Sequence, residues 1–213
     1  MSTLHNDGRV EVERALTLIE VVRSGVTGAS LRRAMTDTLE QFGERGVRLR
    51  GSDVDAIAAV CAALSAVLTE PERDRAVLLL NRLLSEHAGP PRLVRHGGWD
   101  WHVHVDRSDD APWHAWLAAS AAMAMATMLT ESTDGVPWGQ CNAEGCGRLF
   151  VHDGRGGERH YCSTTCSSRE RVRRHRRRRA QAPAAASKAS SASVGNSATA
   201  RAVTLPSASS TTK

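Results

Sequence analysis

Four of the chain's five cysteines lie within 26 residues, in two close pairs whose spacing suits a metal ion. Cys141 and Cys146 are separated by four residues and Cys162 and Cys166 by three, with 15 residues between the pairs. Each pair can supply two thiolates from one turn, and the loop between them can bring the pairs together around a tetrahedral ion. The spacing therefore predicts one structural zinc ion per chain, held by these four cysteines.

Other uses of the same thiols stay open at this stage. The cysteines could remain unliganded, form a redox pair, or bind an iron–sulfur cluster, which takes the same ligands. If zinc is bound, four protein ligands fill its coordination shell, whereas a catalytic zinc keeps one position for water. The pattern thus favours a structural role for the metal over a catalytic one.

The residues around the cysteines are those of a small module built on a metal. Gly145 and Gly147 flank the second cysteine and allow the backbone to bend there. Leu149 and Phe150 are expected to form a small core beneath the metal, with Tyr161 as its other wall. A module of this size buries too little apolar area to fold alone, so the ion contributes stability on the order of 10 kcal/mol.

Two nearby histidines and the fifth cysteine are interpreted as lying outside the metal shell. His152 and His160 are spare ligands, but four cysteines already complete a tetrahedral shell, so we expect both histidines to be exposed in loops. Cys61 falls in a helical pattern between Ile57 and Leu64, and we expect it to be a small buried hydrophobic residue.

A run of arginines follows the cysteines directly. Eight arginines, one acid and one valine lie between Arg169 and Arg179, and a helix beginning near Ser163 would carry these charges around most of its circumference. A solvated helical face normally mixes charges, whereas this run repels itself and attracts phosphate. The expected nucleic-acid contacts are Arg169, Arg171, Arg173, Arg174, His175, Arg176, Arg177, Arg178 and Arg179.

The net positive charge of the chain is confined to its C-terminal third. Residues 1–140 carry a net charge of −5, residues 141–180 one of +7 and residues 181–213 one of +3. This asymmetry points to a polyanionic partner at the C-terminal end, and double-stranded DNA is the first expectation. RNA, an acidic protein or a lipid surface are the alternatives, because an arginine run binds phosphate without reading sequence.

The stretch CNAEGCGRLFVHDGRGGERHYCSTTCSSRERVRRHRRRR, residues 141–179, resembles the CGNR-type zinc finger of bacterial proteins. That family shows Cys-x4-Cys-Gly-x-Leu-Phe, a turn with basic residues, an aromatic residue before Cys-Ser, then Cys-Gly-Asn-Arg and Val-x-x-His-Arg. Ser167 and Ser168 replace the Gly-Asn pair of that pattern, which leaves the ligands intact. The matching positions are Cys141, Cys146, Gly147, Leu149, Phe150, Arg159, Tyr161, Cys162, Ser163, Cys166, Arg169, Val172, His175 and Arg176.

The region before the cysteines is similar to the N-terminal partner of that finger, often called the ABATE domain. The similarity consists of several helices, a hairpin, and a helix that leads into the first cysteine. Family members are described as stress-responsive transcription regulators. The resemblance therefore implies a bacterial DNA-binding regulator whose N-terminal domain senses a ligand or forms dimers.

Apolar periodicity predicts a mainly α fold with one small β-hairpin, an α+β class. The expected helices before the cysteines are residues 11–23, 30–42, 52–68, 69–88 and 112–134. The hairpin is expected at residues 92–105, around Gly97-Gly98. The expected domains are a helical regulatory or sensor domain at residues 1–138, the zinc finger with its arginine-rich helix at 139–179, and a disordered Ser/Ala-rich tail at 180–213.

The hairpin carries a second group of residues that could do chemistry. His102, His104 and Asp106 share one face of a strand, as three candidate metal ligands, and His96 and His114 lie near them in the sequence. We expect this face to be solvated and the protein to be no enzyme, since the sequence has no nucleophile elbow, phosphate loop or HExxH helix. An enzyme or ligand sensor that uses the hairpin is the alternative, and one metal or two per chain would distinguish them.

The composition favours a soluble, intracellular protein. Hydrophobic residues make up 41% of the chain but aromatic residues only 4%, so alanine and leucine must fill the core. The N-terminal residues contain no apolar signal segment, and no apolar run reaches the roughly 18 residues of a membrane span. We expect a cytoplasmic, nucleoid-associated protein without a membrane partner, while a homodimer and a small-molecule effector of the N-terminal domain stay open.

Overall fold

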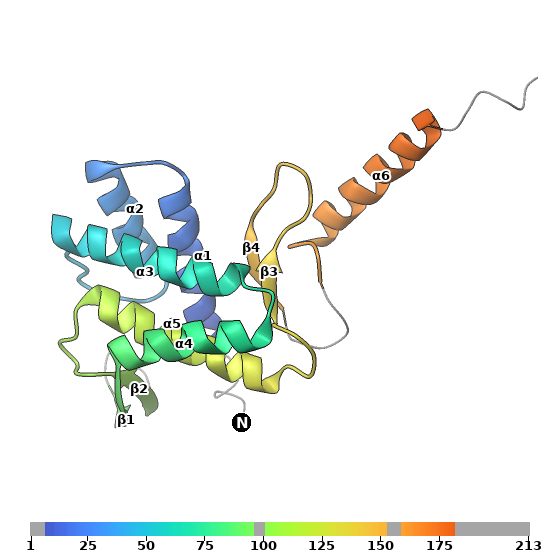
Figure 1. Ribbon diagram of the computed structural model, residues 1–213. Coiled ribbons are helices and arrows are strands. Elements are labelled where there is room, and N and C mark those ends of the chain that lie inside the picture. The colour runs from blue at the N-terminus through green and yellow to red at the C-terminus, as the bar shows by residue number, and fades with distance from the viewer. Residues whose placement is uncertain (1–6, 96–100, 153–158, 182–213) are drawn as a thin grey trace, which may run out of the picture.

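The computed structural model describes residues 7–95, 101–152 and 159–181 (Figure 1). Its elements are α1 (Asp7–Arg23), α2 (Gly28–Gln41), α3 (Gly51–Thr69), α4 (Arg73–His87), β1 (Ala88–Val94), β2 (His102–Asp106), α5 (Trp113–Glu131), β3 (Trp138–Gln140), β4 (Leu149–Val151) and α6 (Thr164–Gln181). The expected mainly α fold class is confirmed, and each expected helix is present with its ends shifted by a few residues. The expectation of a disordered tail concerns residues that lie, from 182 onward, outside the described part of the chain.

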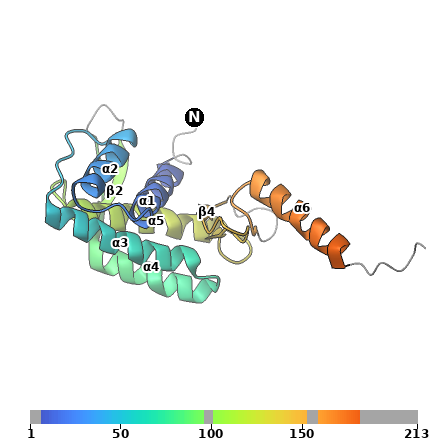
Figure 2. The same ribbon diagram turned by 90° about the horizontal axis from the view of Figure 1, so that it is seen from above.

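Helix α5 is the centre of a helical body made by α1 to α5 (Figure 2). It packs against α1, α3 and α4. Small side chains let these neighbours approach on several sides, so the helix is buried around most of its circumference. Its buried residues are Leu117, Ala118, Ala119, Ala121, Ala122, Ala124, Met125 and Leu129. The expectation that alanine and leucine fill the core is confirmed.

Helix α3 is the one described helix that is long and apolar enough, by length and composition, to cross a membrane, although Asp53 and Asp55 interrupt its apolar sequence. Its valine, isoleucine and leucine side chains lie in the hydrophobic core together with those of α1, α4 and α5. Ile57, Leu64 and Leu68 are among the most buried side chains of the structure. The largest apolar side chains of α3 are thus used in packing inside the helical body.

Arg73, in the first turn of α4, fixes the C-terminal end of α5. Its Nη2 donates to the carbonyl of Leu129 at 2.6 Å, and its Nη1 donates to the carbonyls of Gly135 at 2.6 Å and Ser132 at 3.4 Å. Helix ends leave carbonyls without intrahelical partners, and a cation suits the negative end of the helix dipole. Because β3 follows α5 directly, this cap also positions the start of the zinc-binding region.

In the hairpin of β1 and β2, the face with Trp101 and Val103 is turned to solvent, and not the expected face with His102 and His104. Asp106 is 4% exposed and His102 and His104 are half-buried, whereas Trp101 and Val103 are 63% and 55% exposed. The two strands pair antiparallel and pack against α5. The prediction that the histidine face is solvated is therefore wrong.

Contacts among the inward polar groups explain this orientation. Oδ1 of Asp106 lies 3.0 Å from Nδ1 of His104, and its Oδ2 accepts a hydrogen bond from Arg92 at 3.3 Å. Arg92 also pairs with Asp109 at 2.6 Å. The Nε2 atoms of His102 and His104 are 3.1 Å apart and share a hydrogen bond. Polar groups that are paired with one another can be buried, whereas unpaired ones could not.

Strands β3 and β4 join the zinc-binding region to the helical body. They pair antiparallel, with Trp138 opposite Val151. Trp138 and Leu149 are each 3% exposed and belong to the same hydrophobic core as the five helices of the body. The expected boundary between residues 138 and 139 thus falls inside β3, and the two regions share one core.

Candidate metal centre and basic helix

The loop between β3 and β4 and the start of α6 bring the four predicted ligands together. The Sγ atoms of Cys141, Cys146, Cys162 and Cys166 all lie within 4.8 Å of one another. Those of Cys146, Cys162 and Cys166 are 3.7, 3.7 and 3.8 Å apart. Zinc bound tetrahedrally at about 2.3 Å needs its sulfur ligands about 3.8 Å apart. The sulfurs therefore stand at the separations that a zinc ion requires.

The backbone of the first pair is folded into a tight turn that faces the metal position. The amide of Cys146 donates to the carbonyl of Ala143 at 2.9 Å, which closes the turn. Gly145 and Gly147 have φ values of 73° and 60°. Residues that have a Cβ rarely adopt such positive φ angles, so the predicted bend at both glycines is confirmed.

The alternation of side chains along β4 decides what surrounds the cysteines. Phe150 packs against the ligands together with Tyr161, as expected. Leu149 points to the other face, into the helical core, so the prediction that it lies beneath the metal is wrong. His160 is exposed as expected, but the same prediction for His152 is wrong: it is 5% exposed, with its ring 6.4 Å from that of Phe150.

Two thiols of the cluster, Cys141 and Cys162, have pKa values shifted in opposite directions. Burial raises the pKa of Cys141, but hydrogen bonds from the backbone of Cys162 and Ala143 and from neighbouring thiols outweigh it and lower the pKa to about 7. Burial and the three neighbouring thiols raise the pKa of Cys162 to about 12. A divalent cation removes this conflict, since it stabilises all four thiolates at once.

Cys61 is separate from this cluster, as predicted. It is 1% exposed in the core face of α3. Burial raises the pKa of its thiol to about 12. It is therefore a neutral, small hydrophobic residue of the core.

Helix α6 begins at the metal centre and projects away from the body (Figures 1 and 2). The hydroxyl of Ser163 accepts from the amide of Cys166 at 3.2 Å, which caps the first turn. Cys166 is the one buried residue of the helix. The helix expected to begin near Ser163 thus begins at Thr164, with the ligand Cys166 in its first turn.

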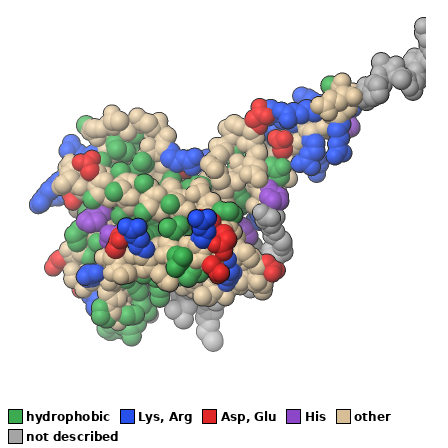
Figure 3. Space-filling model, viewed as in Figure 1, with side chains coloured by type: hydrophobic (Ala, Val, Ile, Leu, Met, Phe, Trp, Pro, Cys, Tyr) green, Lys and Arg blue, Asp and Glu red, His purple; other side chains and the backbone are tan. Residues whose placement is uncertain are grey.

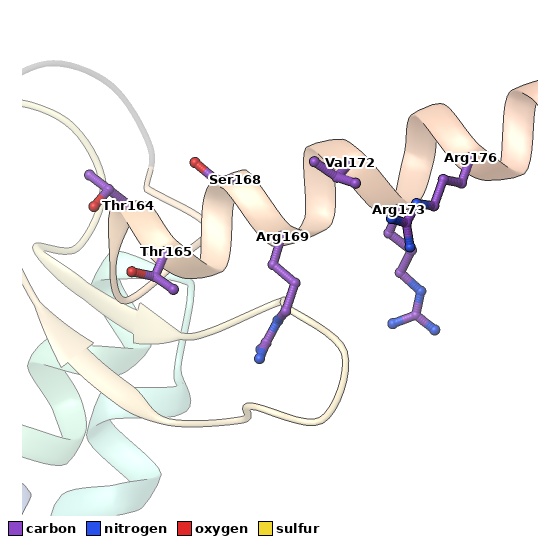
Figure 4. Close-up of a pocket in the computed structure, with 7 residues that line it drawn as sticks. All are labelled: Thr164, Thr165, Ser168, Arg169, Val172, Arg173 and Arg176. Carbon is purple, nitrogen blue, oxygen red and sulfur yellow. The ribbon is translucent and has the colours of Figure 1, made fainter.

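Arginine side chains cover the projecting helix (Figure 3). A shallow groove runs along one side of it, where Arg169 and Arg173 extend in the same direction (Figure 4). The described residues that line this groove are Thr164, Thr165, Ser168, Arg169, Val172, Arg173 and Arg176. The predicted basic residues are thus collected on a single exposed element, while their contact with nucleic acid stays a prediction.

Glu144, in the turn between the first two cysteines, pairs with two arginines of α6. It forms ion pairs with Arg173 and, at 3.3 Å, with Arg177. The hydrogen bond from Arg173 and the charges of both guanidinium groups hold the pKa of the Glu144 carboxyl below its usual value. Sequence reasoning missed this residue, because nothing in its local spacing marks it as a partner of a helix 33 residues further along the chain.

The alternative site at the hairpin is not assembled as a metal site. Over the described residues, the cysteines are the one group of at least three His, Cys, Asp or Glu side chains placed to hold an ion. His102, His104 and Asp106 form a chain of contacts rather than a shared centre. His114 instead meets His87 edge-on at 6.1 Å, and His96 lies outside the described residues.

Comparison with protein families identifies the family that the cysteine-containing region matches. Residues 138–179 match the family model of the CGNR zinc finger, from the first residue of β3 to Arg179. A search of the curated proteins finds no relative that matches the chain. A four-cysteine cluster of this geometry within a CGNR zinc finger is the site of one structural zinc ion, so the expected cofactor is confirmed.

Proposed function

We propose that this protein is a zinc-dependent DNA-binding protein that regulates transcription, and that it contacts DNA through α6. The observation that carries the proposal is the helix itself. It bears eight arginines, has one buried residue, and is anchored at its first turn by a zinc ligand (Figure 3). An α-helix is about 10–12 Å across with its side chains, which suits the roughly 12 Å width of the DNA major groove.

The charge distribution supports a division of roles between the two parts of the chain. Residues 1–140 carry a net charge of −5 and would be repelled by a polyanion, whereas α6 would be attracted. In the proposal, the helical body therefore does not lie along the DNA. It acts as the regulatory part, by binding an effector or a second copy of the chain, as the resemblance to the ABATE domain implies.

The experiment that tests the proposal is selection of bound fragments from genomic DNA by the full-length, zinc-loaded protein, with an RNA pool in parallel. We expect DNA fragments to be enriched and to share a sequence. A Cys162→Ser variant, which lacks one zinc ligand, is the control and should enrich no common sequence. Preferential enrichment of RNA would instead support the RNA-binding alternative.

The proposal assigns no enzymatic activity and no membrane partner to the protein, and it places the protein with the nucleoid in the cytoplasm. The inward contacts of His102 and His104 favour a role in holding the hairpin on the body over a second metal site. A zinc content of one per chain supports this view. A content of two would support the alternative, a ligand-binding or catalytic hairpin.

A further inference from the structure

The basic side chains of α6 differ in what they contact. Arg173 and Arg177 pair with Glu144, and Arg174 donates to the hydroxyl of Tyr161 at 3.4 Å. We call Arg173, Arg174 and Arg177 the inner face of α6, because they are turned toward the zinc-binding region. Two residues of the zinc-binding region thus engage three arginines of the helix.

A second set of arginines points elsewhere. At about 100° per residue, Arg171, Arg178 and Arg179 are centred roughly 130° around the helix from the inner face. All three are exposed, and among the residues that the structure describes none forms a side-chain hydrogen bond or ion pair with them. We call these three residues the outer face of α6.

The two faces should behave differently toward phosphate. An arginine that binds phosphate contributes to affinity because it releases counterions from the nucleic acid. Arg173 and Arg177 already share the single carboxylate of Glu144 and must give it up, at least in part, before both can pair with phosphate. The arginines of the outer face have no such competitor among the described residues.

We infer that the outer face of α6 binds the phosphates of duplex DNA, while Glu144 and Tyr161 hold the inner face and so set the direction of the helix. This inference rests on the proposed function. It makes Glu144 a positioning residue, because it would act on DNA through Arg173 and Arg177 and not by direct contact.

Two triple variants with the same loss of charge test the assignment. One replaces Arg171, Arg178 and Arg179 by glutamine, and the other replaces Arg173, Arg174 and Arg177 by glutamine. Full-length, zinc-loaded proteins are titrated against a selected duplex and a scrambled duplex at several salt concentrations. Zinc content and helical circular dichroism show that each variant is folded.

We expect the outer-face variant to lose up to about 2.7 from the log–log salt slope on both duplexes, at about 0.9 for each phosphate contact. The inner-face variant should keep its slope to within about one contact, that is about 0.9. It should lose most of the preference for the selected duplex over the scrambled one, because the helix is no longer held in one direction.

A second pair of variants tests the role of Glu144 independently. Glu144→Gln releases Arg173 and Arg177, so the slope on the scrambled duplex should become steeper by up to about 1.8. Glu170→Gln is the matched control: it removes one negative charge from α6 itself, but its side chain pairs with none of the described residues. Its slope should stay within about 0.9 of that of the unchanged protein.

The outcomes separate failure of this inference from failure of the proposed function. Equal slope losses in the two triple variants, or a larger loss at the inner face, would overturn the assignment of faces and leave DNA binding in place. An unchanged slope in Glu144→Gln would overturn the role given to that residue. If the unchanged protein bound no duplex, the proposed function would fail, and this inference with it.

Discussion

Each cysteine of the cluster contributes one corner of the zinc site, so its loss cannot be replaced from nearby. Replacing Cys162 by serine should reduce the zinc content of the purified protein from about one per chain to nearly none, because a hydroxyl is a poor zinc ligand beside three thiolates. Elemental analysis measures this directly. The matched control is Cys61→Ala, which removes the cysteine outside the cluster and should keep the zinc. Full zinc content in a Cys146/Cys166 double serine variant would refute the assignment.

The buried thiol of Cys61 should make the protein sensitive to alkaline pH. Burial raises its pKa from 9.0 to about 12, so between these values the folded protein keeps a proton that the unfolded chain loses. Its contribution to stability is complete below pH 9 and is lost as pH rises toward 12, at about 1.4 kcal/mol per pH unit. Urea unfolding at pH 8 to 11 measures this contribution. The unchanged protein should lose stability more steeply than Cys61→Ala, and equal slopes would contradict the prediction.

At the residue scale, the zinc ligands and the arginine-rich helix could be predicted from the sequence, because both signals are local. Two close cysteine pairs and a run of like charges are visible within a few tens of residues. Glu144 was not predictable in the same way. Its role depends on the contact between α6 and the turn that carries the first two cysteines. That contact forms only when the four cysteines come together in the folded protein.

At the scale of elements, the cap that Arg73 places on α5 should be a measurable source of stability. Replacing Arg73 by alanine removes three charged hydrogen bonds to carbonyls at the C-terminal end of α5, and the Leu129 carbonyl keeps only the long bond from the Ser132 amide, at 3.3 Å. We expect a loss of about 2–3 kcal/mol in the free energy of unfolding. Urea denaturation checks this value. Arg75→Ala, on the exposed side of the same helix, should change stability by less than about 0.5 kcal/mol.

The helices were predictable from the sequence, whereas the orientation of the hairpin was not. Apolar periodicity is repeated over three or more turns in α1 to α5, so local signals agree with the final packing. Alternation in β2 indicated correctly that His102, His104 and Asp106 share a face. It could not indicate which face is covered, since that depends on pairing with Arg92 in β1 and on packing against α5.

At the scale of the whole molecule, the shared core predicts that zinc stabilises the helical body as well as the finger. Trp138 and Leu149 lie in β3 and β4, the strands on either side of the loop with the first two cysteines, and are packed among the helices. Removing zinc with a chelator should lower the thermal midpoint of the helical signal by roughly 5 °C or more, in one transition. Thermal circular dichroism with and without chelator measures the shift. A helical transition unaffected by zinc removal would show that the two regions unfold separately.

The strand that begins at Trp138 also restricts how this finger can be exchanged between proteins. Transplanting residues 139–181 onto another scaffold would separate β3 from its first residue and strip Leu149 of the helices that cover it. The recipient would have to supply an apolar surface that covers Leu149. We therefore expect the finger to be transferred between proteins together with the helical body, as one unit.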